Sequence, residues 1–133
     1  MNGHGPLVDT SVLIDYFGGI TSRETEILDR LLDQGPAPST APIIMQEYLQ
    51  GLTDPDEFTL ARADLEHFDQ LPPANYQLHL RAAQAHVRIK RRGLTVPTID
   101  SLIVTMALEA RCPLLTKDKR QREFARFLKV RLA

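Results

Sequence analysis

The sequence has one cysteine, no tryptophan and no apolar run of about 18 residues that would suggest a membrane span. Its single cysteine, Cys112, cannot form an internal disulfide and matches no thiolate metal-site spacing, so a disulfide scaffold and a cysteine-ligated zinc site are excluded. The first residues, Met-Asn-Gly-His-Gly-Pro, have neither the basic nor the apolar region of an export signal. We therefore expect a cytoplasmic protein without a membrane segment.

Histidine-based sites are missing too. His4, His67, His79 and His86 show neither an HExxH pattern nor a paired ligand spacing. The sequence also has no internal repeat, low-complexity tract or long linker. Its 133 residues, 43% of them apolar, are enough for one compact domain and too few for two. We expect a single domain spanning residues 1–133.

A formal net charge of −1 conceals a strong asymmetry along the chain. Residues 1–80 contain 3 basic and 13 acidic side chains, whereas residues 81–133 contain 13 basic and 4 acidic ones. A protein that handles a polyanion can show this pattern, with a basic surface contacting phosphates and acidic groups holding metal. Mutual neutralisation of the two halves, within the fold or between subunits, is the alternative explanation.

Short apolar segments alternate with helical patterns. Strands are predicted at residues 7–8 and 114–116, with weaker candidates at 36–41 and 127–130. Helices are predicted from Ser11 to about residue 17, from a capping box at Thr21 and Glu24 to Gly35, from Pro42 to Gly51, from Asp54 towards Phe68, from Asn75 to Arg92, from an N-cap at Thr98 to Ala110, and around Phe124. In the helix after Asn75 the predicted inward residues are Tyr76, Leu80, Ala83 and Val87. The alternation predicts an α/β fold in which helices cover both faces of a parallel sheet.

Acidic residues occur where strands end. Asp9 follows the first predicted strand and Asp118 closely follows the strand at 114–116, whereas Asp100 lies in the first turn of an apolar helix. Ligands of open parallel sheets bind at the carboxyl ends of the strands. Carboxylates buried together are unfavourable unless cations neutralise them, and Mg²⁺ or Mn²⁺ prefers such oxygen ligands. The pattern indicates a site for divalent cations.

Such a site suggests phosphodiester hydrolysis. One ion would lower the pKa of a bound water to give the nucleophile, and a second would stabilise the leaving oxygen. Thr10, Ser11 and Thr116 could hydrogen-bond a carboxylate or a metal-bound water, although turn formation and helix capping explain the first two equally well.

Each acid also has a structural interpretation. Asp100 could serve the positive end of a helix dipole, and Asp118 could cap the last helix. Glu47 taken alone is typical of a solvated helical residue, and Asp15 is typical of a surface or supporting residue. The joint pattern favours a shared site over four separate structural roles.

Four segments carry a family resemblance: Leu-Val-Asp-Thr-Ser-Val-Leu-Ile-Asp at 7–15, Glu47, Val-Pro-Thr-Ile-Asp-Ser-Leu-Ile-Val at 96–104, and Leu-Leu-Thr-Lys-Asp at 114–118. Together they make the chain resemble PIN-domain ribonucleases of the VapC toxin type over nearly its whole length. The resemblance implies a three-layer α/β/α sandwich with a short, mainly parallel sheet. It also implies an endoribonuclease dependent on Mg²⁺ or Mn²⁺, with Asp9, Glu47, Asp100 and Asp118 as catalytic and metal-binding acids. It further implies a homodimer and a type II toxin–antitoxin pair, in which a VapB-like antitoxin places its C-terminal segment in the active-site groove.

Basic residues near these motifs are candidates for contact with RNA phosphates: Lys90, Arg91, Arg92, Lys117, Lys119, Arg120 and Arg122. A solvated basic face, or pairing with an antitoxin segment, explains any one of them comparably well.

Two other classes of function stay open. An aspartate-based phosphoryl-transfer domain also places acids after parallel strands, but it would need an acidic pair or an Asp-x-Asp motif, whereas Thr10 and Ser11 follow Asp9. A catalytically silent PIN-like binding domain is the second alternative, which the four intact acids disfavour.

Overall fold

A four-stranded parallel sheet forms the centre of the protein. The computed structural model describes residues 4–133. The strands β1 (Leu7–Val8), β2 (Ser39–Thr40), β3 (Asp69–Gln70) and β4 (Leu114–Leu115) stand in the order β3-β2-β1-β4. Leu7 pairs with Ser39 on one side and with Leu114 on the other. Strand β1 therefore lies between its sequence neighbour β2 and the distant β4.

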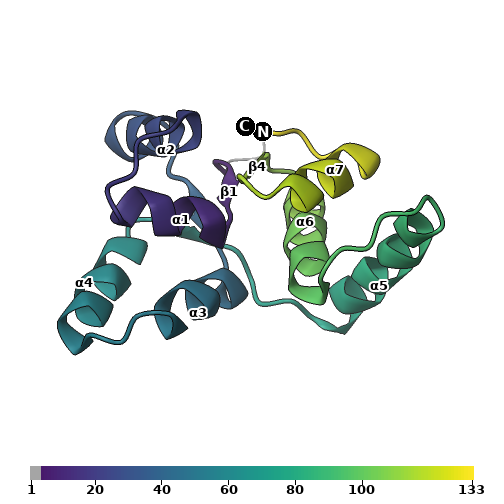
Figure 1. The fold of residues 1–133 in the computed structure, drawn as a ribbon, viewed down its shortest axis with the longest axis horizontal. Helices are drawn as coiled ribbons and strands as arrows, with labels where there is room; N and C mark the ends of the chain where they lie inside the picture. The colour runs from purple at the N-terminus through teal and green to yellow at the C-terminus, as the bar shows by residue number, and fades with distance from the viewer. Residues whose placement is uncertain (1–3) are drawn as a thin grey trace.

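Seven helices surround this sheet in the described part of the chain: α1 (Thr10–Phe17), α2 (Arg23–Asp33), α3 (Pro42–Gln50), α4 (Pro55–Leu65), α5 (Tyr76–Lys90), α6 (Thr98–Ala110) and α7 (Lys119–Phe127). Figure 1 shows α1 to α4 on one side of β1 and β4, and α5 to α7 on the other. The predicted α/β/α sandwich with a parallel sheet is confirmed. No helix within residues 4–133 has the length and apolar character to cross a bilayer.

The core follows from this layering. Both residues of β1 and both of β4 are buried, because helices cover the two faces of the sheet. In α6 every residue from 101 to 107 is buried, including Ser101 and Thr105, whose hydroxyl groups donate to backbone carbonyls of Thr98 and Ser101. Helix α6 is thus an interior element that holds Asp100, at its first turn, against the sheet.

Three predicted N-caps were wrong. Helix α1 is capped by Asp9, whose carboxylate accepts from the backbone N–H of Ser11, and not by Ser11 itself. Ser22 caps α2 together with Thr25, in place of Thr21 and Glu24. Helix α6 already includes Thr98, follows Pro97 and has no side-chain cap. A cap must stand in extended conformation just before the first helical residue, so a shift of one or two positions changes the capping side chain.

The buried face of α5 was also predicted wrongly. Ala82, Ala85 and Ile89 are buried, whereas the expected Tyr76, Leu80, Ala83 and Val87 are exposed. The helix packs against α6, and two of its three buried residues are alanines. Alanine side chains let two helices approach closely. A prediction based on the most hydrophobic residues of α5 therefore chose the wrong face of the helix.

The C-terminal strand predicted at residues 127–130 does not form. Phe127 is the last residue of α7, and Lys129 adopts a positive φ of 61° that turns the chain. The chain reaches the sheet only after this segment, where Leu132 forms an isolated parallel bridge to Leu114. Strand β3, in contrast, was not predicted, because its two residues are polar and exposed and carry no apolar signal.

Candidate active site

The site lies at the carboxyl ends of β1 and β4. The chain connections after these two parallel strands go to opposite sides. The connection from β1 leads towards β2, whereas β4 lies on the other side of β1. Asp9 follows β1 and is 4% exposed. Its Oδ2 accepts from the N–H of Ser11 at 3.0 Å and from the hydroxyl of Thr116, after β4, at 3.3 Å. This switch point is where open parallel sheets bind ligands.

Gln121 joins two of the predicted acids. Its Nε2 donates to Oδ1 of Asp9 at 2.9 Å and to Oδ1 of Asp100 at 3.1 Å. The side chain is 1% exposed, and its Oε1 has no hydrogen-bond partner within residues 4–133. Sequence analysis missed Gln121; its place in the first turn of the helix after the strand at 114–116 was the available signal.

Glu47 approaches the site from α3. Its Oε1 accepts a hydrogen bond of 2.9 Å from the hydroxyl of Thr10, the first residue of α1. Thr10 directly follows Asp9, so this bond ties the Glu47 carboxylate to the end of β1. Thr10 therefore contacts one acid while Thr116 contacts another.

Asp118 caps α7, as its structural interpretation anticipated. Its Oδ1 accepts from the backbone N–H of Gln121 at 2.9 Å, while its own N–H donates to the Thr116 hydroxyl at 3.0 Å. The cap therefore fixes the first turn of α7 and with it the position of Gln121.

The electrostatics of Asp100 show that the four acids converge. Burial, together with the negative charges of Asp118, Asp9 and Glu47, raises the pKa of this carboxyl from 3.8 to about 6, while the hydrogen bond from Gln121 opposes the change. The charges of Asp118, Asp9 and Glu47 therefore act on Asp100, although the four residues are far apart in the sequence.

A sequence model described as the PIN domain matches residues 7–127, which includes all four acids. The chain belongs to the PIN domain family. Asp9 follows β1, Asp118 caps α7 after β4, Asp100 lies in the first turn of α6, and Glu47 lies in the second half of α3.

Solved structures share the fold at low sequence identity. A chain of the FitAcB structure from Neisseria gonorrhoeae is 20% identical, with 95% of this chain and 94% of that chain covered and a TM-score of 0.73. A chain of VapBC-1 from nontypeable Haemophilus influenzae is 16% identical, with 96% and 95% covered and a TM-score of 0.74. A chain of a toxin–antitoxin complex from Klebsiella pneumoniae is 22% identical, with 88% and 89% covered and a TM-score of 0.63. All three likenesses show that the PIN fold is common to these chains.

The donor set of this PIN domain suits a hard cation. Its converging side chains offer carboxylate, hydroxyl and amide oxygens, which Mg²⁺ and Mn²⁺ prefer, and the buried Oε1 of Gln121 has no donor within residues 4–133. As arranged, however, no three Asp, Glu, His or Cys side chains of the described residues are grouped to hold a metal. The Gln121 amide stands between Asp9 and Asp100, so it occupies the space in which these two carboxylates would share a cation.

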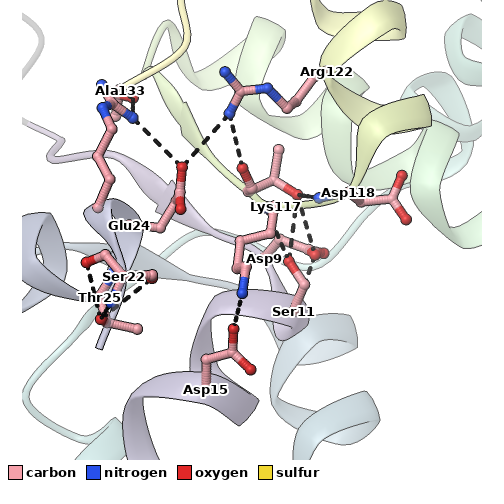
Figure 2. A network of polar contacts seen from close by, with 12 residues as sticks. Asp9, Ser11, Asp15, Ser22, Glu24, Thr25, Lys117, Asp118, Arg122 and Ala133 are labelled. Atoms are coloured by element: carbon pink, nitrogen blue, oxygen red, sulfur yellow. Dashed lines mark hydrogen bonds and ion pairs between the residues drawn. The ribbon is translucent and has the colours of Figure 1, made fainter. Parts of the chain in front are cut away.

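Two of the basic residues predicted to contact RNA also hold the loop between β4 and α7. Lys117 forms an ion pair with Asp15, and its N–H donates to the Ser11 hydroxyl at 3.2 Å. Arg122 donates to the carbonyl of Thr116 at 3.2 Å and lies 3.9 Å from Glu24. Figure 2 shows these contacts arranged around Asp9 and the start of α1. They fix Thr116, and through it Asp9.

The remaining predicted RNA contacts are exposed: Lys90, Arg91, Arg92, Lys119 and Arg120. The guanidinium carbon of Arg92 lies 5.1 Å from the ring centroid of Phe127, at the end of α7. This contact brings the basic end of α5 beside α7. Contact of these residues with RNA stays a prediction.

Proposed function

We propose that this protein is an endoribonuclease dependent on Mg²⁺ or Mn²⁺ and the toxin of a type II toxin–antitoxin pair. The observation that carries the proposal is the meeting of Asp9 and Asp100, far apart in sequence, at one buried amide. The charges of Glu47 and Asp118 act on the same place. The negative charge at this switch point of the PIN domain is unfavourable unless a cation neutralises it. With a cation bound, the site would suit a substrate that carries a phosphate.

Each residue has a defined task in this proposal. Asp9, Glu47, Asp100 and Asp118 would hold the cation, which when bound supplies an activated water and neutralises charge on the scissile phosphate. Thr10 holds Glu47 in place and Thr116 holds Asp9.

Exposed basic side chains beside the acids complete the proposed substrate site. Lys119 and Arg120 stand at the start of α7, immediately after Asp118. They would contact the phosphates that flank the cleaved bond. Such contacts position the strand without reading its sequence, so they predict no base preference by themselves.

An antitoxin fits the groove beside the acids. The groove has a volume of about 560 Å³, runs between α1, α3 and α4, and is lined by Ile14, Glu47, Leu60 and Asp64 among others. Ile14 and Leu60 are 56% and 66% exposed. An amphipathic segment that is apolar on one side and basic on the other would suit this surface, as expected of a VapB-like partner. One of the structural neighbours is itself a toxin–antitoxin complex, which supports the idea. A homodimer in the cytoplasm completes the proposal.

The test is incubation of the purified protein with total RNA and millimolar Mg²⁺, with and without EDTA, followed by mapping of new RNA ends. We expect discrete new ends that EDTA abolishes. A folded protein that produces no ends under these conditions would contradict the nuclease and favour the catalytically silent binding domain.

A further inference from the structure

Gln121 occupies the position that separates the two most converged acids. Its Nε2 contacts one oxygen of Asp9 and one oxygen of Asp100, at 2.9 and 3.1 Å. The N–H hydrogens of an amide carry only partial positive charge, yet they take the place where these carboxylates would share a cation. Among the described residues no ready-made group of three metal-binding side chains exists, which agrees with this place being taken.

The other end of the amide is unsatisfied. Oε1 of Gln121 is buried and accepts no hydrogen bond from residues 4–133. A buried carbonyl oxygen without a donor is unfavourable, so such an atom in an otherwise bonded site calls for an explanation. An amide oxygen is also a good ligand for a hard cation.

We propose that Gln121 is a further metal-binding residue, whose amide nitrogen stands in for the cation in the metal-free protein and whose amide oxygen becomes a ligand in the metal-bound protein. The inference rests on the proposed function, because it concerns the same acids. The exchange requires only that the side-chain amide turn about its terminal bond, since nitrogen and oxygen occupy equivalent positions on that group.

The proposal explains how the metal-free domain tolerates its carboxylates. The two N–H groups neutralise part of the charge on Asp9 and Asp100 by hydrogen bonding. A bound cation repels the same N–H groups, so Gln121 cannot keep these hydrogen bonds in the metal-bound protein. The backbone N–H of Gln121 remains bonded to Asp118 and keeps the side chain in the site.

The experiment compares Mn²⁺ binding by wild-type protein, Gln121→Met and Gln121→Glu, measured by isothermal titration calorimetry. Methionine matches the length of glutamine without offering an amide, and glutamate offers a full carboxylate. Gln84→Met and Gln84→Glu, on the exposed surface of α5, are the matched controls. We expect Gln121→Met to weaken Mn²⁺ binding by about tenfold or more, Gln121→Glu to strengthen it by a similar factor, and the controls to bind as the wild type does.

A second readout is measured on the wild-type protein, and the variants serve only to assign its signals. In wild-type protein labelled with ¹⁵N, the side-chain NH₂ signals of Gln121 are identified by their loss in Gln121→Met or Gln121→Glu. Titration with diamagnetic Mg²⁺ should shift these signals strongly, because both hydrogen bonds to carboxylates are broken. Unmoved signals at saturating Mg²⁺ would overturn the proposal, as would Gln121→Met binding Mn²⁺ as tightly as the wild type.

The RNA assay distinguishes the two levels of inference. If wild-type protein binds Mn²⁺ and cleaves RNA while Gln121→Met binds Mn²⁺ with unchanged affinity, the role of Gln121 is wrong and the nuclease stands. If the wild type neither binds Mn²⁺ nor cleaves RNA, both proposals fall.

Discussion

The hydroxyl of Thr10 donates a 2.9 Å hydrogen bond to the carboxylate of Glu47, a residue 37 positions away in the sequence. Thr10 begins α1 and Glu47 lies near the end of α3, so the bond links two helices that pack against each other. Hydrogen bonds of this kind orient a metal-binding carboxylate and hold it in the conformation that binds.

We predict that Thr10→Val reduces Mg²⁺-dependent RNA cleavage by about 10- to 100-fold, because Glu47 loses its orienting donor. Stability should fall by only about 1 kcal/mol, the usual net value of one hydrogen bond. Cleavage kinetics and urea unfolding measure the two effects. Thr59→Val is the control, since Thr59 is exposed on α4 and donates only to the Pro55 carbonyl. Thr10→Ser should restore cleavage, and full activity of Thr10→Val would contradict the role.

Asp9→Asn and Asp100→Asn should each abolish Mg²⁺-dependent cleavage while the domain stays folded. Asparagine keeps the shape of aspartate and removes the charge that a cation needs. Circular dichroism checks the fold, and RNA end mapping checks activity. Asp69→Asn, on exposed β3, should cleave like the wild type. Unchanged cleavage by both active-site variants would remove the proposed mechanism.

The pKa of Asp100 predicts a dependence of stability on pH. Burial and the neighbouring negative charges raise this pKa from 3.8 to about 6, so between these pH values the unfolded chain releases a proton that the folded chain retains. The Asp100 contribution to the free energy of unfolding therefore decreases as the pH rises from about 4 to about 6 and is constant above that range.

Urea unfolding in EDTA at several pH values tests this. The stability of wild type relative to Asp100→Asn should fall across that window, since asparagine does not titrate. Parallel pH profiles for the two proteins would show that Asp100 has an ordinary pKa. Mn²⁺ binding should strengthen over the same window, because the ionised carboxylate is the form that binds metal.

Lys119→Ala and Arg120→Ala should weaken RNA binding and reduce its dependence on salt. Each lost phosphate contact lowers the slope of log K against log salt by about 0.7 for a single strand. Filter binding in EDTA across a salt series measures the slope without cleavage. Arg62→Ala, exposed on the acidic half of the chain, is the matched control. A slope unchanged in both variants would place these residues outside the RNA interface.

The sequence predicted the architecture because the signals for it are local. Leu7 and Val8 before Asp9, and Leu114 and Leu115 before Thr116, mark buried strands that end at polar residues. The helices between them follow from apolar periodicity over many residues. Strand β3 and the buried face of α5 were not predictable in this way. The exposed residues of β3 carry no apolar pattern, and the face of α5 was selected by close packing on α6.

Asp9, Asp100 and Asp118 were proposed from the sequence because each follows a strand or lies in a recognisable motif, whereas Glu47 was proposed from the family resemblance. Gln121 was not proposed, since the only signal for an uncharged amide was its position in the first turn of the helix after the strand at 114–116. Its importance appears only when the first turn of α7, capped by Asp118, places it against Asp9 and Asp100.

The amino-acid sequence by itself determined the order of elements, the parallel sheet and the set of carboxylates, because these depend on local propensity, periodicity and motif. Only the tertiary structure decided which groups meet. Thr10 contacts Glu47, and the Gln121 amide bridges Asp9 and Asp100. These contacts form because the strand order brings the ends of β1 and β4 together. Contacts between distant residues depend on packing in three dimensions, which no local pattern of the chain encodes.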